Sequence, residues 1–260
     1  MMRQTWRFIT AGFYFQLRMM RGKPDWFLAL ITAPLSTAVF LTIFLHAERQ
    51  DLTAYAVLGP ALIALWQMSL VTAGELITFE RENGTLEALV AAPARFSAVL
   101  FGRILAVCGV SLFAFVESWA VGWAVTGRPE SINRPVILAA TLLLTVLAMA
   151  GWAGVMACVF VLARSARTFQ NALSYPFFVL GGVIVPEALL PEWLQWPAKL
   201  VFLSWSSDLL RASLSASPAT NVSLRLLAIA ILGVAGYLLA AVLLERTLRR
   251  VRQTGSLAHA

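Results

Sequence analysis

Long stretches of apolar residues alternate with short polar breaks along this chain of 260 residues. A helix rises ~1.5 Å per residue, so about 20 apolar residues are needed to cross a hydrocarbon layer roughly 30 Å thick. Five stretches meet this requirement, and a sixth, shorter one contains Tyr175-Pro176 and Gly181-Gly182. The pattern predicts an all-α integral membrane protein with one domain, 1–260, and six spanning helices at about 26–45, 52–75, 98–126, 135–163, 171–186 and 224–244.

Composition supports this prediction and excludes several classes of protein. Hydrophobic residues make up 60% of the chain and charged residues 13%, whereas a soluble domain is about half apolar and about a quarter charged. An ordinary soluble enzyme, a disulfide-rich secreted domain and a disordered chain are therefore excluded. The two cysteines, Cys108 and Cys158, lie inside apolar stretches, which indicates small buried residues rather than a disulfide or a metal pair.

The net charge of +7 indicates membrane topology rather than nucleic-acid binding, because the basic residues gather at the chain ends and in the polar breaks. Cytoplasmic segments of membrane proteins carry an excess of Lys and Arg. With both termini cytoplasmic, only six of the 20 basic residues fall outside, namely Arg49, Arg128, Arg134, Lys199, Arg211 and Arg225. We therefore expect both termini in the cytoplasm.

Residues 1–25 have the pattern of an interfacial amphipathic helix. At 100° per residue, arginines and small polar groups such as Arg7, Thr10 and Arg18 share a narrow face, and aromatic and apolar residues cover the rest. Such a helix lies in the headgroup layer with its arginines toward lipid phosphates. An ordinary flank of the first span is the alternative.

The segment 77–96, between the second and third predicted spans, is rich in charge. Asn83-Gly84 is a typical helix end, Thr85 can cap a new helix, and Pro93 limits that helix to about two turns. We expect a short cytoplasmic helix with acidic residues near its start. The alternative is a solvated connecting loop with charge pairs.

The segment 187–205 is apolar but interrupted by prolines, so it is too broken to cross a bilayer. Trp193, Trp196 and Trp205 favour the interface. We expect a re-entrant pair of short helices that enters from the outer face, next to protein or a water-filled cavity. A loop lying on the surface is the alternative.

Two carboxylates lie in or beside the predicted spans. Glu117 is in the middle of an apolar stretch, where a charge costs on the order of 3 kcal/mol, so it should face the bundle interior or be protonated. Glu75 ends the second predicted span. Both are candidates for a functional role.

No part of the sequence supports catalysis by this chain. A G-x-x-x-x-G-K-[ST] phosphate loop is missing, His46 and His259 lie outside the predicted spans, and no Asp lies inside one. ATP hydrolysis, intramembrane zinc chemistry and an intramembrane aspartyl pair all need side chains that this pattern does not supply.

The stretch Phe79–Leu89, with Pro93 after it, resembles the E-R-E-x-G-T-L-E-x-L…P signature of the ABC-2 type export permeases, in the multidrug and antibiotic-resistance branch. Residues 171–186, followed by Leu189-Leu190-Pro191, look like that family's fifth span and outer gate helices. The length, the number of spans, the interfacial N-terminal helix and the re-entrant outer segment are similar as well, so the resemblance covers nearly the whole chain.

The resemblance implies two permease chains, identical or paralogous, around a central conduit, each docked on a separate ABC ATPase subunit that holds ATP and Mg²⁺. No cofactor is expected on this chain itself. The implied ATPase-coupling residues are Glu80, Arg81, Glu82, Gly84, Thr85, Leu86 and Glu87. The implied outer gate is Phe177, Phe178, Pro186, Pro191, Trp193 and Trp196. Candidates for lining the conduit are Phe40, Phe44, Trp66, Glu75 and Glu117, with ordinary core or lipid-facing aromatics as the alternative for the three rings.

The implied activity is export of a hydrophobic or amphiphilic molecule, such as a drug, an antibiotic, a peptide or a lipid, across a bacterial inner membrane. Export of a polysaccharide or glycolipid is one alternative. An ATP-independent secondary transporter is another, although it predicts an inverted repeat with two matching broken helices and only the Gly181–Pro186 break is evident.

Overall fold

The computed structural model describes residues 2–21, 25–49, 52–82, 96–127, 132–162, 166–186, 189–215 and 218–254. Every regular element in these ranges is a helix. The helices are α1 (Met2–Arg21), α2 (Asp25–His46), α3 (Thr53–Glu82), α5 (Phe96–Ser111), α6 (Phe113–Thr126), α7 (Pro135–Leu162), α8 (Ala166–Leu180), α9 (Glu192–Ala198), α10 (Phe202–Leu214) and α11 (Val222–Thr254).

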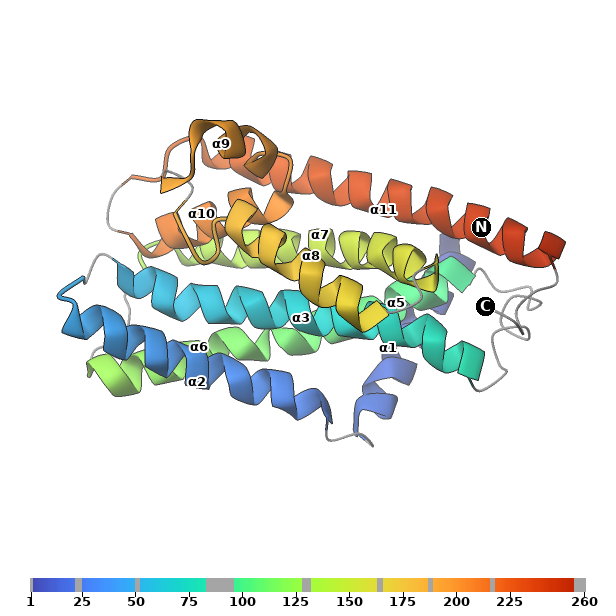
Figure 1. The fold of residues 1–260 in the computed structure, drawn as a ribbon, viewed down its shortest axis with the longest axis horizontal. Coiled ribbons are helices and arrows are strands. Elements are labelled where there is room, and N and C mark those ends of the chain that lie inside the picture. Colours follow the sequence, from blue (N-terminus) through green and yellow to red (C-terminus); the bar gives the residue numbers. More distant parts are fainter. Residues whose placement is uncertain are drawn as a thin grey trace.

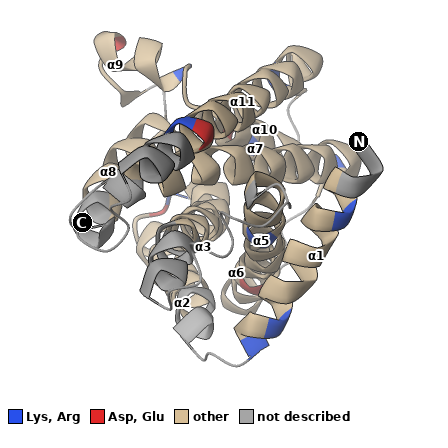
Figure 2. Ribbon diagram, turned by 90° about the vertical axis from the view of Figure 1, so that its right-hand side faces the viewer, with Lys and Arg blue, Asp and Glu red and all other residues tan. Residues whose placement is uncertain are grey.

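The long helices run roughly along one axis, and the short ones lie at the ends of the bundle (Figure 1). α9 and α10 lie at one end, and the carboxyl end of α11 lies at the other. α1 crosses that second end at a steep angle to the bundle axis, as the view along the axis shows (Figure 2). The interfacial position predicted for residues 1–25 stays a prediction.

Four helical stretches of the described residues are long and apolar enough to cross a membrane: Thr53–Leu70, Ser97–Thr126, Pro135–Val159 and Val222–Arg246. Ile31–His46 of α2 is apolar but shorter. The all-helical, multi-pass architecture predicted from the sequence is therefore confirmed. The predicted total of six spans stays a prediction.

The predicted span 98–126 is two helices, α5 and α6, which meet at Leu112. The hydroxyl of Ser111 donates to the carbonyl oxygen of Cys108 at 2.8 Å, and Leu112 N donates to Gly109 O, three residues back. Such a local bond replaces regular i→i−4 geometry and bends helices. The Ser111 bond thus accompanies a short departure from regular hydrogen bonding at Leu112, whose φ of −59° and ψ of −22° remain helical.

α3 continues past the predicted end of the second span, Glu75, to Glu82. Its 30 residues make a helix of ~45 Å, longer than the hydrocarbon layer, so the end of the span itself stays a prediction. The fifth helix does not run over 171–186, because α8 ends at Leu180. Gly182 has φ of +60°, a left-handed conformation that ends a helix and that glycine adopts without strain.

Small residues allow close helix packing around α7. Gly151 and Gly154 of α7 face Gly233, Tyr237 and Ala240 of α11, and the indole N–H of Trp152 donates to Leu232 O at 3.1 Å. In lipid there is no hydrophobic driving force between helices. Close packing of small residues and interhelical hydrogen bonds therefore hold the bundle together. α7 and α11 therefore form a rigid pair against which α3, α5 and α10 pack.

α1 packs tightly on α5 through glycines. A Cβ at Gly12 would collide with the backbone carbonyl of Val99, and a Cβ at Gly102 with that of Ile9. Beside this contact, the buried guanidinium of Arg103 donates to Gln16 Oε1 at 3.0 Å and lies over the Phe15 ring, 5.1 Å from its centroid. α1 is thus fastened to a membrane-spanning helix over much of its length.

Candidate functional site

The predicted coupling segment begins on the last turn of α3. Glu80, Arg81 and Glu82 continue that helix, at the same end of the bundle as α1. Gly84, Thr85, Leu86 and Glu87 lie outside the described residues, as does the short helix predicted there.

The conduit candidate Trp66 and the gate candidates Phe177 and Phe178 lie together between α3 and α8. The Trp66 and Phe177 rings are stacked, with centroids 4.5 Å apart, and Phe178 meets Trp66 edge-on at 6.5 Å. Trp66 has no exposed surface and Phe178 is 3% exposed. In this conformation Trp66 is therefore a core residue.

Hydrogen bonds join the same two helices. The indole N–H of Trp66 donates to Ser174 Oγ at 3.2 Å, and the Ser174 hydroxyl in turn donates to Gln170 O at 2.7 Å. One turn further along α3, Leu70 O accepts a bond of 3.1 Å from the Gln170 side-chain amide. Buried polar groups in lipid need such partners, so the two helices are matched in register.

The turn that follows α8 is held by α10. Ser207 donates to Gly181 O at 2.6 Å, and Arg211 donates to Gly182 O at 2.9 Å. The Arg211 guanidinium also lies over the Tyr55 ring of α3, 4.1 Å from its centroid. The bond from the guanidinium to the Gly182 carbonyl is charge-assisted. Arg211 of α10 thus contacts both α3 and the turn that follows α8.

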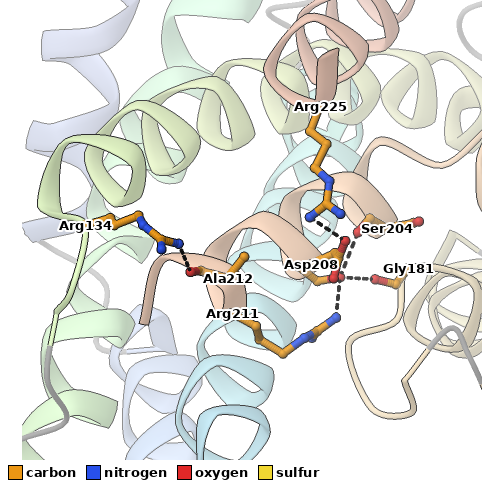
Figure 3. A network of polar contacts seen from close by, with 8 residues as sticks. Arg134, Gly181, Ser204, Asp208, Arg211, Ala212 and Arg225 are labelled. Carbon is orange, nitrogen blue, oxygen red and sulfur yellow. Dashed lines mark hydrogen bonds and ion pairs between the residues drawn. The ribbon is translucent and has the colours of Figure 1, made fainter. Parts of the chain in front are cut away.

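The carboxyl end of α10 is capped by the segment before α7. Asn133 Nδ2, the Arg134 backbone N–H and Arg134 Nη1 donate to the carbonyls of Leu214, Ser213 and Ala212 at 2.6, 3.1 and 3.1 Å. These are carbonyls that a helix end leaves without partners. Arg225 forms an ion pair of 2.9 Å with Asp208 of α10. Arg134 and Arg225 reach α10 from different sides (Figure 3).

These contacts help to explain how nine of the 13 residues of α10 can be buried, although the buried Ser206 Oγ has no hydrogen-bond partner among the described residues. The charge pattern predicts Arg134, Arg211 and Arg225 only as basic residues on the outer side. The signal was available, since Ser204, Ser206, Ser207, Asp208 and Arg211 interrupt an otherwise apolar stretch. The interruption is consistent with a helix that Arg134 and Arg225 contact from neighbouring segments and whose own Arg211 bonds the Gly182 carbonyl.

The remaining gate candidates lie near α9 and have the opposite exposure to Phe178. Trp193 and Trp196 are 71% and 76% exposed, and Pro191 is exposed, while Pro186 is half-buried. The Lys199 ammonium lies 5.3 Å from the Trp196 ring centroid. The structure therefore does not bring the tryptophans into the same core as Phe177 and Phe178.

The other conduit candidates are dispersed. Phe40 and Phe44 are stacked at 6.4 Å and half-buried against α3 and α6. Glu117 lies on α6, and its Oε2 is buried without a hydrogen-bond partner in the described part of the chain. The Glu75 side chain lies outside the described part of the structure. No single described cavity collects these residues.

The cysteines are as predicted. Cys108 and Cys158 are free and buried, and Cys108 Sγ lies 3.1 Å from Ser69 Oγ. Within the described ranges, no three His, Cys, Asp or Glu side chains gather as a metal site would require.

An all-helical bundle with several apolar helices of membrane-spanning length defines a multi-pass membrane protein. The sequence model of the ABC-2 type transporter family matches residues 7–215, and the chain belongs to this family. It is thus a transmembrane component of an ABC transporter and a non-catalytic subunit. Comparison with curated proteins gives no significant match.

Proposed function

We propose that the chain is the permease subunit of an ATP-driven exporter that moves a hydrophobic or amphiphilic molecule out of the cytoplasm or the inner leaflet. Membership of the ABC-2 type transporter family carries the proposal. A separate ATPase subunit binds ATP and Mg²⁺, and a second permease chain completes the conduit. The Glu80-Arg81-Glu82-Asn83-Gly84-Thr85 sequence favours the drug-exporting branch over the polysaccharide exporters.

Both termini are proposed to lie on the cytoplasmic side of a bacterial inner membrane. The bundle end that carries α1 and the last turns of α11 also carries the end of α3, which leads to the coupling segment. Arg7, Arg18, Arg21 and Arg246 are exposed on α1 and α11. An excess of exposed arginine is typical of the cytoplasmic end.

The direct test is purification of the tagged chain from its native cells. An ATPase subunit should accompany it, and vesicles that contain the complex should move an amphiphilic dye only with Mg²⁺ and ATP. Transport that proceeds equally without ATP, with no ATPase attached, would favour the secondary transporter. Transport of an undecaprenyl-linked glycan in place of the dye would favour the polysaccharide exporter.

The coupling role predicts that Glu82→Ala and Gly84→Pro leave folding intact and lower transport per ATP hydrolysed by about tenfold, or ~1.4 kcal/mol of coupling. The reason is that the segment after α3 would press against the ATPase. Dye transport and phosphate release measured on one sample give the ratio. Glu245→Ala, an exposed acidic residue of α11, is the control. Unchanged ratios in both test variants refute the coupling role.

The interfacial role of α1 predicts a dependence on anionic lipid. A groove of about 460 Å³ is lined by Ala11, Tyr14, Phe15 and Arg18 on one face of this helix, which suits a phosphate headgroup and the start of its acyl chain. Arg18→Gln should reduce the stabilisation that phosphatidylglycerol gives over phosphatidylcholine in nanodiscs by about 1 kcal/mol. Arg49→Gln, at the opposite end of the bundle, should leave it unchanged.

A further inference from the structure

α3 and α8 each lead to one end of the molecule. α3 reaches Glu82, where the coupling segment begins, and α8 reaches the turn at Gly181-Gly182, which α10 holds at the opposite end. The contacts between α3 and α8 are one route by which movement of α3 can reach this turn. α3 also meets α10 directly, where the Arg211 guanidinium lies over the Tyr55 ring.

Those contacts form a compact group, which we name the α3–α8 latch: Trp66, Leu70, Gln170, Ser174 and Phe177. It contains two hydrogen bonds, from Trp66 Nε1 to Ser174 Oγ and from Gln170 Nε2 to Leu70 O, and the stacked pair of Trp66 and Phe177. The bonded residues are four apart on each helix, in opposite chain directions, so the two bonds are one helical turn apart.

The latch resists sliding of one helix along the other. Trp66, Gln170 and Ser174 are 0%, 5% and 1% exposed, so water cannot replace a broken bond. A shift of one turn would leave the indole N–H and the amide without partners, which is costly inside a membrane. The carbonyl of Leu70 lies 12 residues before Glu82, ~18 Å along a single helix, so displacement of that end is carried to the latch.

We propose that the α3–α8 latch transmits displacement of the cytoplasmic end of α3 to α8, and through the Gly181-Gly182 turn to α10 and α9. Trp66, Ser174 and Gln170 are positioning residues in this role, because they act on the outer segment through α8. The inference rests on the proposed function, since it needs an ATPase that moves the coupling segment. Coupling of this kind travels through packed side chains and hydrogen-bond networks between rigid elements.

The test reads the outer end directly and needs no knowledge of the exported molecule. Cys108 and Cys158 are replaced by alanine, and Leu200→Cys, at a position 70% exposed just after α9, provides a single reactive thiol. The complex with its co-purified ATPase is placed in nanodiscs. The rate of labelling by a polar maleimide is measured without nucleotide and with Mg²⁺, ATP and vanadate, and ATP hydrolysis is measured in parallel.

Two variants break the same bond in different ways, and one variant is the matched control. Trp66→Phe keeps the stacked ring and removes the N–H, and Ser174→Ala removes its acceptor. Trp152→Phe removes an equivalent indole bond, to Leu232 O, between α7 and α11. We expect the first two to reduce the nucleotide-dependent change in labelling about threefold to tenfold, the range for residues in a coupling network, with ATP hydrolysis retained.

The double variant should be no worse than either single one, because both remove one bond, and Ser174→Thr should restore the response. A full response in Trp66→Phe, or an equal loss in Trp152→Phe, overturns the latch. The latch is also overturned if none of the three variants folds (Trp66→Phe, Ser174→Ala and Ser174→Thr), because the contact is then needed only for the fold. If the unsubstituted complex lacks an ATPase or shows no response to nucleotide, the proposed function itself fails.

Discussion

Substitution of Gly102 by valine is expected to detach α1 from α5 and to lower the thermal stability of the protein strongly. Any Cβ at this position would occupy the space of the Ile9 carbonyl group, which is backbone and cannot rotate away. The helices must therefore separate, and the buried bond from Arg103 to Gln16 would be lost with the contact. Overpacking of this kind costs about 3 kcal/mol, or roughly 6–12 °C in melting temperature for a chain of this size.

The same helix provides the control. Gly109 lies two turns further along α5 and is exposed, and a Cβ at this position would meet no atom within 4 Å. Gly109→Val should change the melting temperature of the detergent-solubilised protein by no more than about 1–2 °C, which is what a surface substitution of ~0.5 kcal/mol causes. Equal shifts for both variants would show that helix propensity, rather than the approach of α1, sets the cost.

Hydropathy predicts the bounds of the long apolar helices best where a helix begins or ends at a recognisable residue, such as a proline. The fourth predicted span, 135–163, agrees with α7 to one residue, because Pro135 suits the first helical position and an apolar stretch follows it. The first and last spans agree similarly with α2 and α11, although α11 extends ten residues beyond its predicted end. There the apolar stretch stops at Leu244 but the helix continues through charged residues.

Helical periodicity could separate a polar from an apolar face of α1, but it could not find the face that packs. The buried stripe contains Gly12, Gln16 and Met20 and lies opposite the arginine face, but only Met20 is one of the large apolar residues that the periodicity predicts there. Gly12 is buried because α5 approaches it, and Gln16 because it accepts a bond from Arg103. Both reasons lie on another helix, more than 80 residues away in the chain.

The candidate site shows the same limit. Trp66 and Phe177 were assigned to a conduit and to a gate, yet they stack on one another. The sequence shows that aromatic side chains stand at these positions, but which ring stacks on which depends on the antiparallel register of α3 and α8. That register is set by Gln170 and Ser174, two polar residues that carry no distinctive motif.

Loss of the Arg211 guanidinium is the second large effect that we expect, and it should destabilise the segment that contains α9 and α10. Arg211→Met keeps the apolar stem and removes the bond to Gly182 O and the cation–π contact with Tyr55. A buried carbonyl left without its charged donor costs ~1–3 kcal/mol, and the cation–π contact adds ~1 kcal/mol. A total of about 3 kcal/mol follows, because Gly182 is buried and solvent cannot replace the donor.

The comparison variant is Arg225→Met, which removes an ion pair of 2.9 Å to Asp208. The Asp208 side chain is 52% exposed, so the pair should contribute no more than ~1 kcal/mol. Thermal unfolding should therefore show a fall for Arg211→Met about three times that for Arg225→Met, and limited proteolysis should cut the chain near α9 only in the former. A larger fall for Arg225→Met would mean that the ion pair, rather than the Gly182 carbonyl bond, holds α10 in place.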